Sequence, residues 1–290
     1  MRLSTSTCIY FNRPDGSRST IQNCVEQCAA AGYRVMDMSF HDCSMFPTPF
    51  QTDGWEDWLY DIRRTADRCG VTFSQGHAHF YNYCDPNLPN AAWQEELVRR
   101  SIVGAQILGI PWLATHAATD FSSPTPVADS RKKGLEYLGE HLELAKKYQV
   151  GLAVENLWEG NIAPKRRYTS FAEELVELVD LLAQDHDNVG ICWDAEHTGI
   201  MHQDPMQTLR LFGSRLKTTH ISDYTAIDND HLLPFFGRIN WQEVMDALRA
   251  IDYQGDFTYE IFRYTTTIPE AMIPEALRYS VKVGECLLSM

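Results

Sequence analysis

The segment NVGICWDAEHTGI (residues 188–200) joins a short apolar run to a group of polar side chains. Residues 188–194 are typical of a buried β-strand, because the run is short, rich in apolar residues and ends at a charged one, Asp194. Three other strand-like runs end in the same way. They carry Glu155 in GLAVEN (151–156), His220 in LKTTHISD (216–223) and Glu260 in GDFTYEIF (255–262).

Outward from these runs, strand-like and helical segments alternate along the whole chain. Amphipathic segments, such as the one carrying Leu135, Leu138 and Leu142, separate eight strand-like runs. These runs are 3–11, 33–40, 71–80, 111–117, 150–156, 188–194, 216–222 and 256–261. Eight βα units in 290 residues predict an α/β fold, a (β/α)8 TIM barrel, as a single domain over residues 1–290. The alternative is a doubly wound open sheet, but no G-x-G-x-x-G turn follows the first run.

Composition narrows the class of protein. The net charge of -14 opposes non-specific binding to nucleic acid or anionic membranes, so we expect neither as a partner. The eight cysteines contain no C-x2-C pair and suggest no disulfide framework. No stretch approaches the roughly 18 to 20 apolar residues of a membrane span. The first residues, MRLSTSTCIYF, lack the features of a signal peptide, and we therefore expect a cytoplasmic protein.

The polar strand ends indicate a metal site. In a barrel of parallel strands, the carboxyl ends of the strands surround one mouth. Four side chains from the fifth to the eighth run can therefore converge there: Glu155, Asp194, His220 and Glu260. Any one of them alone is more simply a salt-bridged or hydrogen-bonded structural residue. Together they would repel or neutralise one another unless a cation joined them. The oxygen-rich set predicts one divalent metal ion, with Mn²⁺, Mg²⁺ or Co²⁺ favoured and Zn²⁺ also compatible.

Further side chains are expected around the same mouth. Four histidines could donate to substrate hydroxyls or bind further metal, with a structural role equally open: His77, His116, His197 and His231. His77 and His79 alternate along one run, so at most one faces the mouth, and we expect His77. The histidines without a partner pattern are interpreted as surface residues: His41, His141, His186 and His202. Aromatic residues that could stack on a ring are Tyr10, Phe11, Phe46, Phe80, Tyr81 and Trp158.

At these residues the chain resembles the xylose isomerase-like barrel superfamily. This group contains sugar isomerases, ketose 3-epimerases, inosose dehydratases and abasic-site endonucleases. The resemblance is carried, in order, by VEN (154–156), WDAEHTG (193–199), HISD (220–223), DHLLPFFGRINW (230–241) and YEIF (259–262). It implies that the four strand-end residues bind the metal, that Glu155 and Glu260 form the acid/base pair, and that His197 holds a substrate oxygen. It also implies that the chain could form a homo-oligomer, because family members often pair through barrel helices.

Two positions depart from patterns within the superfamily. In the endonuclease branch, a cluster of three zinc ions also uses an aspartate at the position of Asn229. Asp228 and Asp230 flank this position, but a shift of one residue is expected to change the direction of the side chain. The epimerase branch often has a second glutamate at the position of Asn161, and Glu159 lies two residues earlier. We therefore count Glu159 among the candidate substrate-binding residues.

The residue types predict chemistry next to a carbonyl group. A metal bound by the carbonyl and a neighbouring hydroxyl would stabilise an enediolate, while glutamates remove and return a proton. The leading hypothesis is thus a divalent-metal-dependent sugar isomerase or epimerase acting on a ketose or keto-sugar. The alternative is a keto-sugar or keto-inositol dehydratase or lyase on the same metal site. A zinc-dependent abasic-site endonuclease is disfavoured by the negative charge and by Asn229. A barrel that senses a sugar without catalysis is a further alternative.

Overall fold

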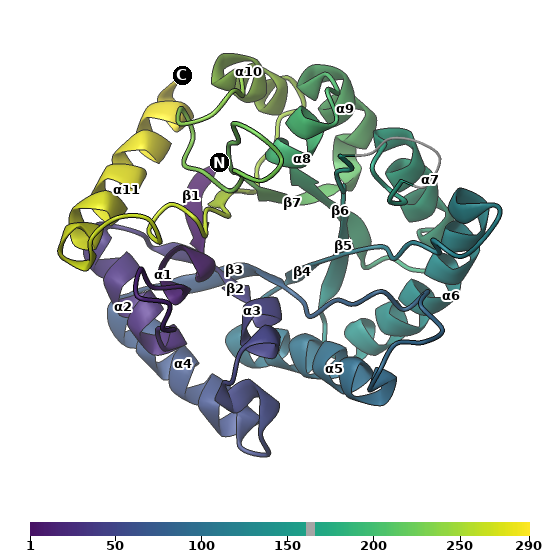
Figure 1. Ribbon diagram of the computed structural model, residues 1–290, viewed down its shortest axis with the longest axis horizontal. Coiled ribbons are helices and arrows are strands. Elements are labelled where there is room, and N and C mark those ends of the chain that lie inside the picture. The colour runs from purple at the N-terminus through teal and green to yellow at the C-terminus, as the bar shows by residue number, and fades with distance from the viewer. Residues whose placement is uncertain (161–165) are drawn as a thin grey trace.

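Eight parallel strands form the centre of the molecule (Figure 1). The computed structural model describes residues 1–160 and 166–290. The strands are β1 (Arg2–Ser6), β2 (Val35–Ser39), β3 (Thr72–His77), β4 (Trp112–Thr115), β5 (Gly151–Glu155), β6 (Val189–Asp194), β7 (Leu216–His220) and β8 (Asp256–Tyr259). They pair in the order β7-β6-β5-β4-β3-β2-β1-β8. Just beyond β7, the Ile221 N–H donates to the Thr258 carbonyl at 2.8 Å, which brings β7 against β8 and nearly closes the barrel.

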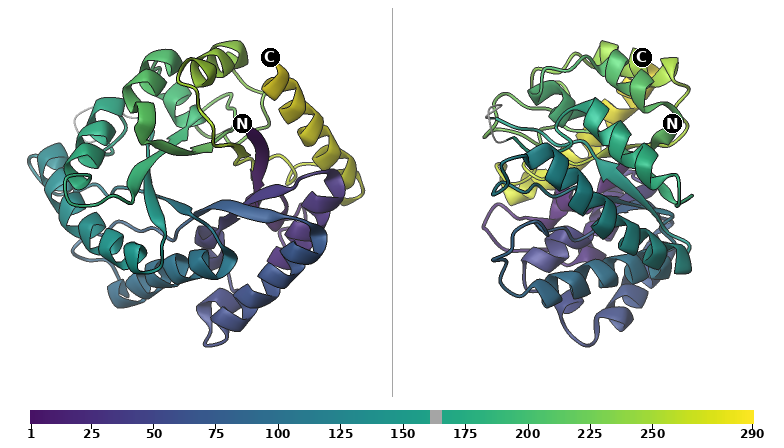
Figure 2. Two further views of the ribbon diagram at one scale, coloured as in Figure 1. Left: turned by 180° about the vertical axis from the view of Figure 1, so that it is seen from behind. Right: turned by 90° about the vertical axis from the view of Figure 1, so that its right-hand side faces the viewer.

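Helices surround the strands, as the views from behind and from the side also show (Figure 2). They are α1 (Cys8–Phe11), α2 (Ile21–Ala31), α3 (Phe40–Met45), α4 (Trp55–Cys69), α5 (Ala91–Leu108), α6 (Pro126–Lys147), α7 (Ala172–Leu182), α8 (Ala195–Ile200), α9 (Pro205–Phe212), α10 (Trp241–Ala250) and α11 (Ile273–Ser289). Short 3₁₀ turns are η1 (Pro49–Gln51), η2 (Gly213–Arg215) and η3 (Glu270–Met272). The last helix, α11, lies between α10 and α2 and completes the ring. The predicted single-domain (β/α)8 TIM barrel is confirmed.

Alternation along the strands separates the two sides of the barrel wall. On β2, Met36 and Met38 are fully buried in the core between strands and helices. Ala153 on β5 and Cys192 on β6 belong instead to a small cluster inside the barrel. Because side chains alternate along a strand, the positions two residues after these also point inward. Glu155 and Asp194 occupy those positions. The same alternation that turns Ala153 and Cys192 inward therefore turns the two carboxylates into the mouth.

The first strand is shorter than the sequence predicts. The run 3–11 was expected to be one strand, but β1 ends at Ser6 and Cys8–Phe11 forms α1. All four residues of α1 are buried, which explains why this apolar stretch resembles a strand in sequence. The chain must turn at the barrel mouth, and the Phe11 N–H donates to the Thr7 carbonyl to close that turn. Within the described residues, we find no helix with both the length and the apolar character needed to cross a membrane.

Candidate active site

Four potential ligands converge at the carboxyl ends of β5 to β8. Glu155, Asp194 and His220 are the last residues of β5, β6 and β7, and Glu260 directly follows β8. Asp194 and His220 are partners in the β6–β7 register, so their side chains lie next to each other. One ligand atom from each of the four residues lies within 4.8 Å of the others. Adjacent parallel strands thus place together four side chains that are distant in sequence.

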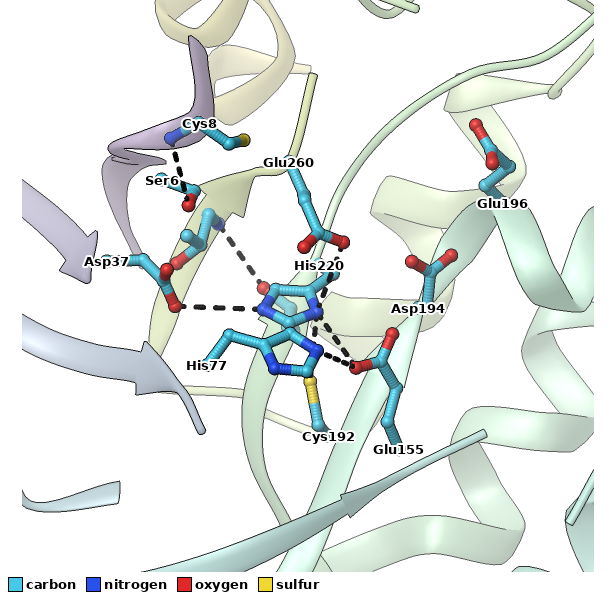
Figure 3. Close-up of polar contacts among 12 residues, drawn as sticks. Ser6, Cys8, Asp37, His77, Glu155, Cys192, Asp194, Glu196, His220 and Glu260 are labelled. Carbon is cyan, nitrogen blue, oxygen red and sulfur yellow. Dashed lines mark hydrogen bonds and ion pairs between the residues drawn. The ribbon is translucent and has the colours of Figure 1, made fainter. Parts of the chain in front are cut away.

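The geometry of this cluster fits a divalent cation. The Nδ1 atom of His220 lies 3.2 Å from Oε2 of Glu155 and 3.5 Å from Oε2 of Glu260 (Figure 3). Asp194 is fully buried, and its Oδ2 atom has no hydrogen-bond partner among the described residues. A buried carboxylate oxygen without a partner is costly unless a cation compensates it. Three carboxylates and one imidazole are a suitable donor set for Mn²⁺, Mg²⁺ or Co²⁺, and also for Zn²⁺.

The electrostatics of the cluster also favour a cation. Burial, together with Glu155 and Glu260, raises the pKa of Asp194 well above its usual value. Burial opposes ionisation of Glu155, but His220 and hydrogen bonds to neighbouring histidines lower its pKa well below the usual value. For His220, burial is outweighed by Cys192, Glu260 and Glu155, and the pKa is well above normal. Without a metal, protons on Asp194 and His220 would therefore supply the compensation that a cation can replace.

His77 and His116 extend the cluster along the inner wall. Their Nε2 atoms lie 3.4 Å and 3.3 Å from Oε2 of Glu155. Burial lowers the pKa of His116 to about 4, so its imidazole is neutral at physiological pH. His79 points elsewhere, because its Nε2 lies 2.6 Å from Oε1 of Gln94 on α5. Of the two alternating histidines, His77 is therefore the one directed at the carboxylates.

His197 and His231 also lie at the mouth. The His197 N–H donates to Oδ1 of Asp194 at 2.7 Å, so this aspartate also caps α8. The Nδ1 atom of His197 lies 2.8 Å from the Asn156 carbonyl, which can only accept and therefore places the ring proton on Nδ1. The Nε2 atom of His231 lies 3.7 Å from Oε2 of Glu260. Both imidazoles thus contact ligands or the residues that hold them.

In the loop after β7, the neighbouring side chains of Asn229 and Asp230 point in different directions. Asn229 is exposed, and its Nδ2 donates to Oγ1 of Thr225 at 2.6 Å. Asp230 points in another direction: it is buried, and its Oδ2 lies 3.7 Å from Nδ1 of His231. His231 has a φ of 52°, in the left-handed region. Asp230 also pairs with Arg263 at 2.5 Å.

Glu159 lies at the edge of this region. Its Oε2 accepts the backbone N–H of Arg167 at 3.2 Å, and Arg167 rather than Glu159 lines the cavity above the carboxylates. Asn161, the other position singled out in this loop, lies outside the described residues.

A cavity of about 440 Å³ opens above the carboxylates and is lined by Glu155, Glu260, His77, His116, His197 and His231. Its size lies within the usual range for small-molecule sites. Of the candidate aromatic residues, Phe80, Tyr81 and Trp158 line it, whereas Tyr10 and Phe11 are buried in the core. His41 also lines the cavity and stacks on Phe80, with ring centroids 4.0 Å apart. The surface interpretation of His41 is therefore wrong, and that of His141 is wrong too, because His141 is buried.

Two fully buried acidic residues that lie against site histidines were missed in the sequence. Asp37 on β2 is fully buried, and its Oδ2 lies 3.7 Å from Nε2 of His220. Glu196 is also fully buried and accepts the His231 N–H at 2.7 Å. Burial raises the pKa of Glu196 to about 7. The available signal was a charged residue in the interior of an apolar strand for Asp37, and a position within the WDAEHTG motif for Glu196.

Fold and site together define a (β/α)8 barrel with a candidate metal centre at the carboxyl ends of its last four strands. The chain belongs to the xylose isomerase-like TIM barrel family, which matches residues 25–283. A D-psicose 3-epimerase from Enterocloster bolteae is 26% identical over 247 residues, 82% of this chain and 75% of that protein. The uncharacterized protein y4fM from Sinorhizobium fredii is 33% identical over 113 residues, which cover 38% of this chain and 33% of that protein.

Solved structures share the fold at low sequence identity. A crystal structure of D-psicose 3-epimerase in the presence of D-fructose has a TM-score of 0.76 at 18% identity, covering 100% of both chains. The IOLI protein with a bound zinc atom has a TM-score of 0.78, also at 18% identity, covering 100% of this chain and 98% of that one. At these identities the likeness shows the fold alone.

Proposed function

We propose that the protein is a divalent-metal-dependent sugar isomerase or epimerase that acts on a ketose or keto-sugar. The observation that carries the proposal is the convergence of Glu155 and Glu260 on Nδ1 of His220, at 3.2 Å and 3.5 Å. Two carboxylates that lie this close together can exchange protons with opposite faces of a substrate bound between them. The relationship to a D-psicose 3-epimerase over 82% of the chain supports the same reaction class.

The metal would be held by the four strand-end residues, Glu155, Asp194, His220 and Glu260. When bound, a divalent cation supplies Lewis-acid polarisation of the sugar carbonyl. One of the two glutamates removes the proton from the carbon next to that carbonyl, and a glutamate returns a proton to this carbon or its neighbour. Return to the opposite face gives an epimer, and return to the neighbouring carbon gives an isomer. Burial would raise the pKa of Glu155, but His220 and hydrogen bonds to neighbouring histidines hold it well below its usual value, which favours the ionised form that can accept a proton.

The histidines orient the carboxylates and the substrate. His77 and His116 contact Glu155, and His231 approaches Glu260, so each proposed acid/base group has an imidazole beside it. His197 carries its proton on Nδ1, which leaves Nε2 to accept a hydrogen bond from a sugar hydroxyl. Glu159 holds the backbone of Arg167, a residue of the cavity wall, and so shapes the substrate side of the site.

A small sugar is the proposed partner, and the net charge of -14 speaks against nucleic acid. All eight cysteines are free thiols, which supports the proposed cytoplasmic location.

The dehydratase or lyase alternative uses the same residues. If a hydroxyl group leaves from the carbon beyond the one that loses its proton, water is eliminated. The discriminating experiment incubates the Mn²⁺-loaded protein in D₂O with a panel of ketoses and keto-inositols. An epimerase or isomerase yields a product that has lost no water and in which a solvent deuterium replaces a carbon-bound hydrogen. A product that has lost one water would instead establish the lyase. No conversion of any member of the panel would count against both.

The number of metal ions bound per chain distinguishes the nuclease alternative from the proposed isomerase or epimerase. It requires three zinc ions per chain, whereas the proposal requires one ion. His77, His116 and Glu155 are close enough to hold a further ion, as are Glu196, Asp230 and His231. Elemental analysis of the purified protein therefore tests this alternative directly, and three zinc ions per chain would favour it.

A further inference from the structure

A buried carboxylate that the proposed chemistry does not use lies beneath the four strand-end residues. Asp37 is in the middle of β2, between Met36 and Met38, which face the core outside the barrel wall. Its side chain therefore points into the barrel, where it is fully buried. Its Oδ1 atom has no hydrogen-bond partner among the residues that the structure describes. A buried carboxyl group in this position requires polar partners for its oxygens.

The side chain of Asp37 faces the far side of the His220 ring. Oδ2 of Asp37 lies 3.7 Å from Nε2 of His220, within the range of an ion pair (Figure 3). This Nε2 atom is buried and makes no hydrogen bond to the described residues. Glu155 and Glu260 approach the ring from the opposite side, at Nδ1. His220 therefore lies between the proposed ligand carboxylates and Asp37.

The two sides of the ring have different requirements. A neutral imidazole has one N–H and one lone pair. If Nδ1 is the ligand atom, its lone pair must face the metal position, and the proton must be on Nε2. A buried Nε2–H needs an acceptor, and Asp37 is a carboxylate placed on that side. With the proton on Nδ1 instead, His220 could not act as a ligand through the nitrogen that faces Glu155.

A hydrogen-bonded network fixes the position of Asp37. Gln75 on β3 donates from Nε2 to Oδ2 of Asp37 at 3.1 Å and to the Thr219 carbonyl at 3.2 Å. Thr258 on β8 donates its hydroxyl to Oε1 of Gln75 at 3.1 Å. The amide of Gln75 is thereby oriented with its NH₂ group toward Asp37. The network joins β2, β3, β7 and β8 across the barrel interior and leaves the carboxylate little freedom to turn.

We propose that Asp37 is a positioning residue that keeps the proton of His220 on Nε2 and so presents Nδ1 as a metal ligand. The proposal rests on the metal site of the proposed function. It adds a residue from β2, outside the half-ring of strands that carries the four ligands. Asp37 does not touch the substrate, and its effect is exerted through His220.

The first test measures Mn²⁺ affinity by titration calorimetry on the metal-free protein. Asp37→Asn keeps an acceptor but removes the charge, and Asp37→Leu removes both. Loss of a partner that orients a metal ligand typically weakens binding about 10- to 100-fold, so we expect this range for Asp37→Leu and a smaller loss for Asp37→Asn. The matched control is Asp256→Asn, since Asp256 is also buried at a barrel strand but pairs with Arg2 at the other end of β8.

A second measurement uses the wild-type protein, so it stands even if a variant fails to fold. In the Zn²⁺-loaded protein, ¹⁵N NMR of the His220 ring should show the proton on Nε2. That proton should resonate downfield because it faces a carboxylate, and it should move upfield in Asp37→Asn. A wild-type ring protonated on Nδ1 would overturn the proposal.

The outcomes separate this inference from the proposed function. Weaker Mn²⁺ binding in both Asp37 variants, with Asp256→Asn unchanged, supports the role of Asp37. Wild-type affinity in both folded Asp37 variants overturns it and leaves the proposed function standing. A wild-type protein that binds no divalent ion contradicts the proposed function and, with it, this inference.

Discussion

The carboxylate of Glu155 lies 3.2 Å from Nδ1 of His220, although the two residues are 65 positions apart in the sequence. The contact arises because β5, β6 and β7 are neighbours and end at the same mouth. Glu155 pairs in register with Cys192, and Asp194, two residues further along β6, pairs with His220. Parallel strands in this register bring the ends of several chain segments to one point. The proposed chemistry depends on that convergence.

Replacing either glutamate should remove the acid/base function. We expect Glu155→Gln and Glu260→Gln each to lower turnover of the ketose substrate by about 10² to 10⁴-fold, the usual contribution of a positioned acid or base. Glutamine has nearly the same shape, so the fold should survive, as circular dichroism would show. The control is Glu56→Gln on the exposed surface of α4. Full activity in both active-site variants would refute the assignment of the pair.

Metal binding should release protons and become tighter as pH rises. Burial and neighbouring carboxylates raise the pKa of Asp194, and Glu260 and Glu155 help to raise that of His220 against the effect of burial. Without a metal, both groups therefore hold their protons more tightly than usual, and they must lose them to become ligands. Calorimetry in buffers of different ionisation enthalpy would count the protons released. An affinity that does not change between about pH 6 and pH 8 would contradict this electrostatic description.

His141 offers a pH-dependent test of stability away from the site. Burial alone would lower its pKa, but hydrogen bonds to Glu95 and to the Tyr137 carbonyl raise it above the usual value. The charged imidazole therefore stabilises the folded state fully below the unfolded pKa of about 6.5, and this contribution is lost as pH rises through the folded pKa.

Urea unfolding should accordingly show a larger loss of stability for His141→Gln at about pH 5.5 than at about pH 9, on either side of the titration. His202→Asn, at an exposed position, serves as the control. An equal loss at both pH values would show that the interaction does not depend on the charge of His141.

Asp223 should stabilise the loop that carries His231. Its Oδ1 accepts N–H groups from Arg238 and Ile239, and its Oδ2 accepts the Trp241 indole N–H at 2.9 Å. In Asp223→Asn, an NH₂ group replaces one of the two carboxylate oxygens and faces N–H groups that also need an acceptor. We expect a loss of about 1 to 3 kcal/mol in the free energy of unfolding. Asp228→Asn, exposed in the same loop, should change it little, and equal effects of the two substitutions would contradict this role.

The sequence predicts the barrel and the strand-end ligands because both depend on local pattern. Each ligand follows an apolar run, and the end of a run is visible without knowledge of neighbouring strands. The sequence does not single out Asp37, because this residue lies inside a strand. Its side chain points into the barrel only because Met36 and Met38 on either side face the outer core. The burial of His141 is not predicted either, because it comes from tertiary packing that the spacing of residues along the chain does not reveal. The contact of Asp230 with Arg263 joins two loops that are distant in sequence, which the residue types alone do not indicate.

The central claim is that Glu155, Asp194, His220 and Glu260 form one divalent metal site. Its most direct test is a Mn²⁺ titration of the metal-free protein, monitored by calorimetry, with Glu260→Gln measured in parallel. We predict one tight site per chain in the wild type and a strongly weakened site in the folded variant. A wild type that binds no Mn²⁺, or a variant that binds it equally well, would contradict the claim.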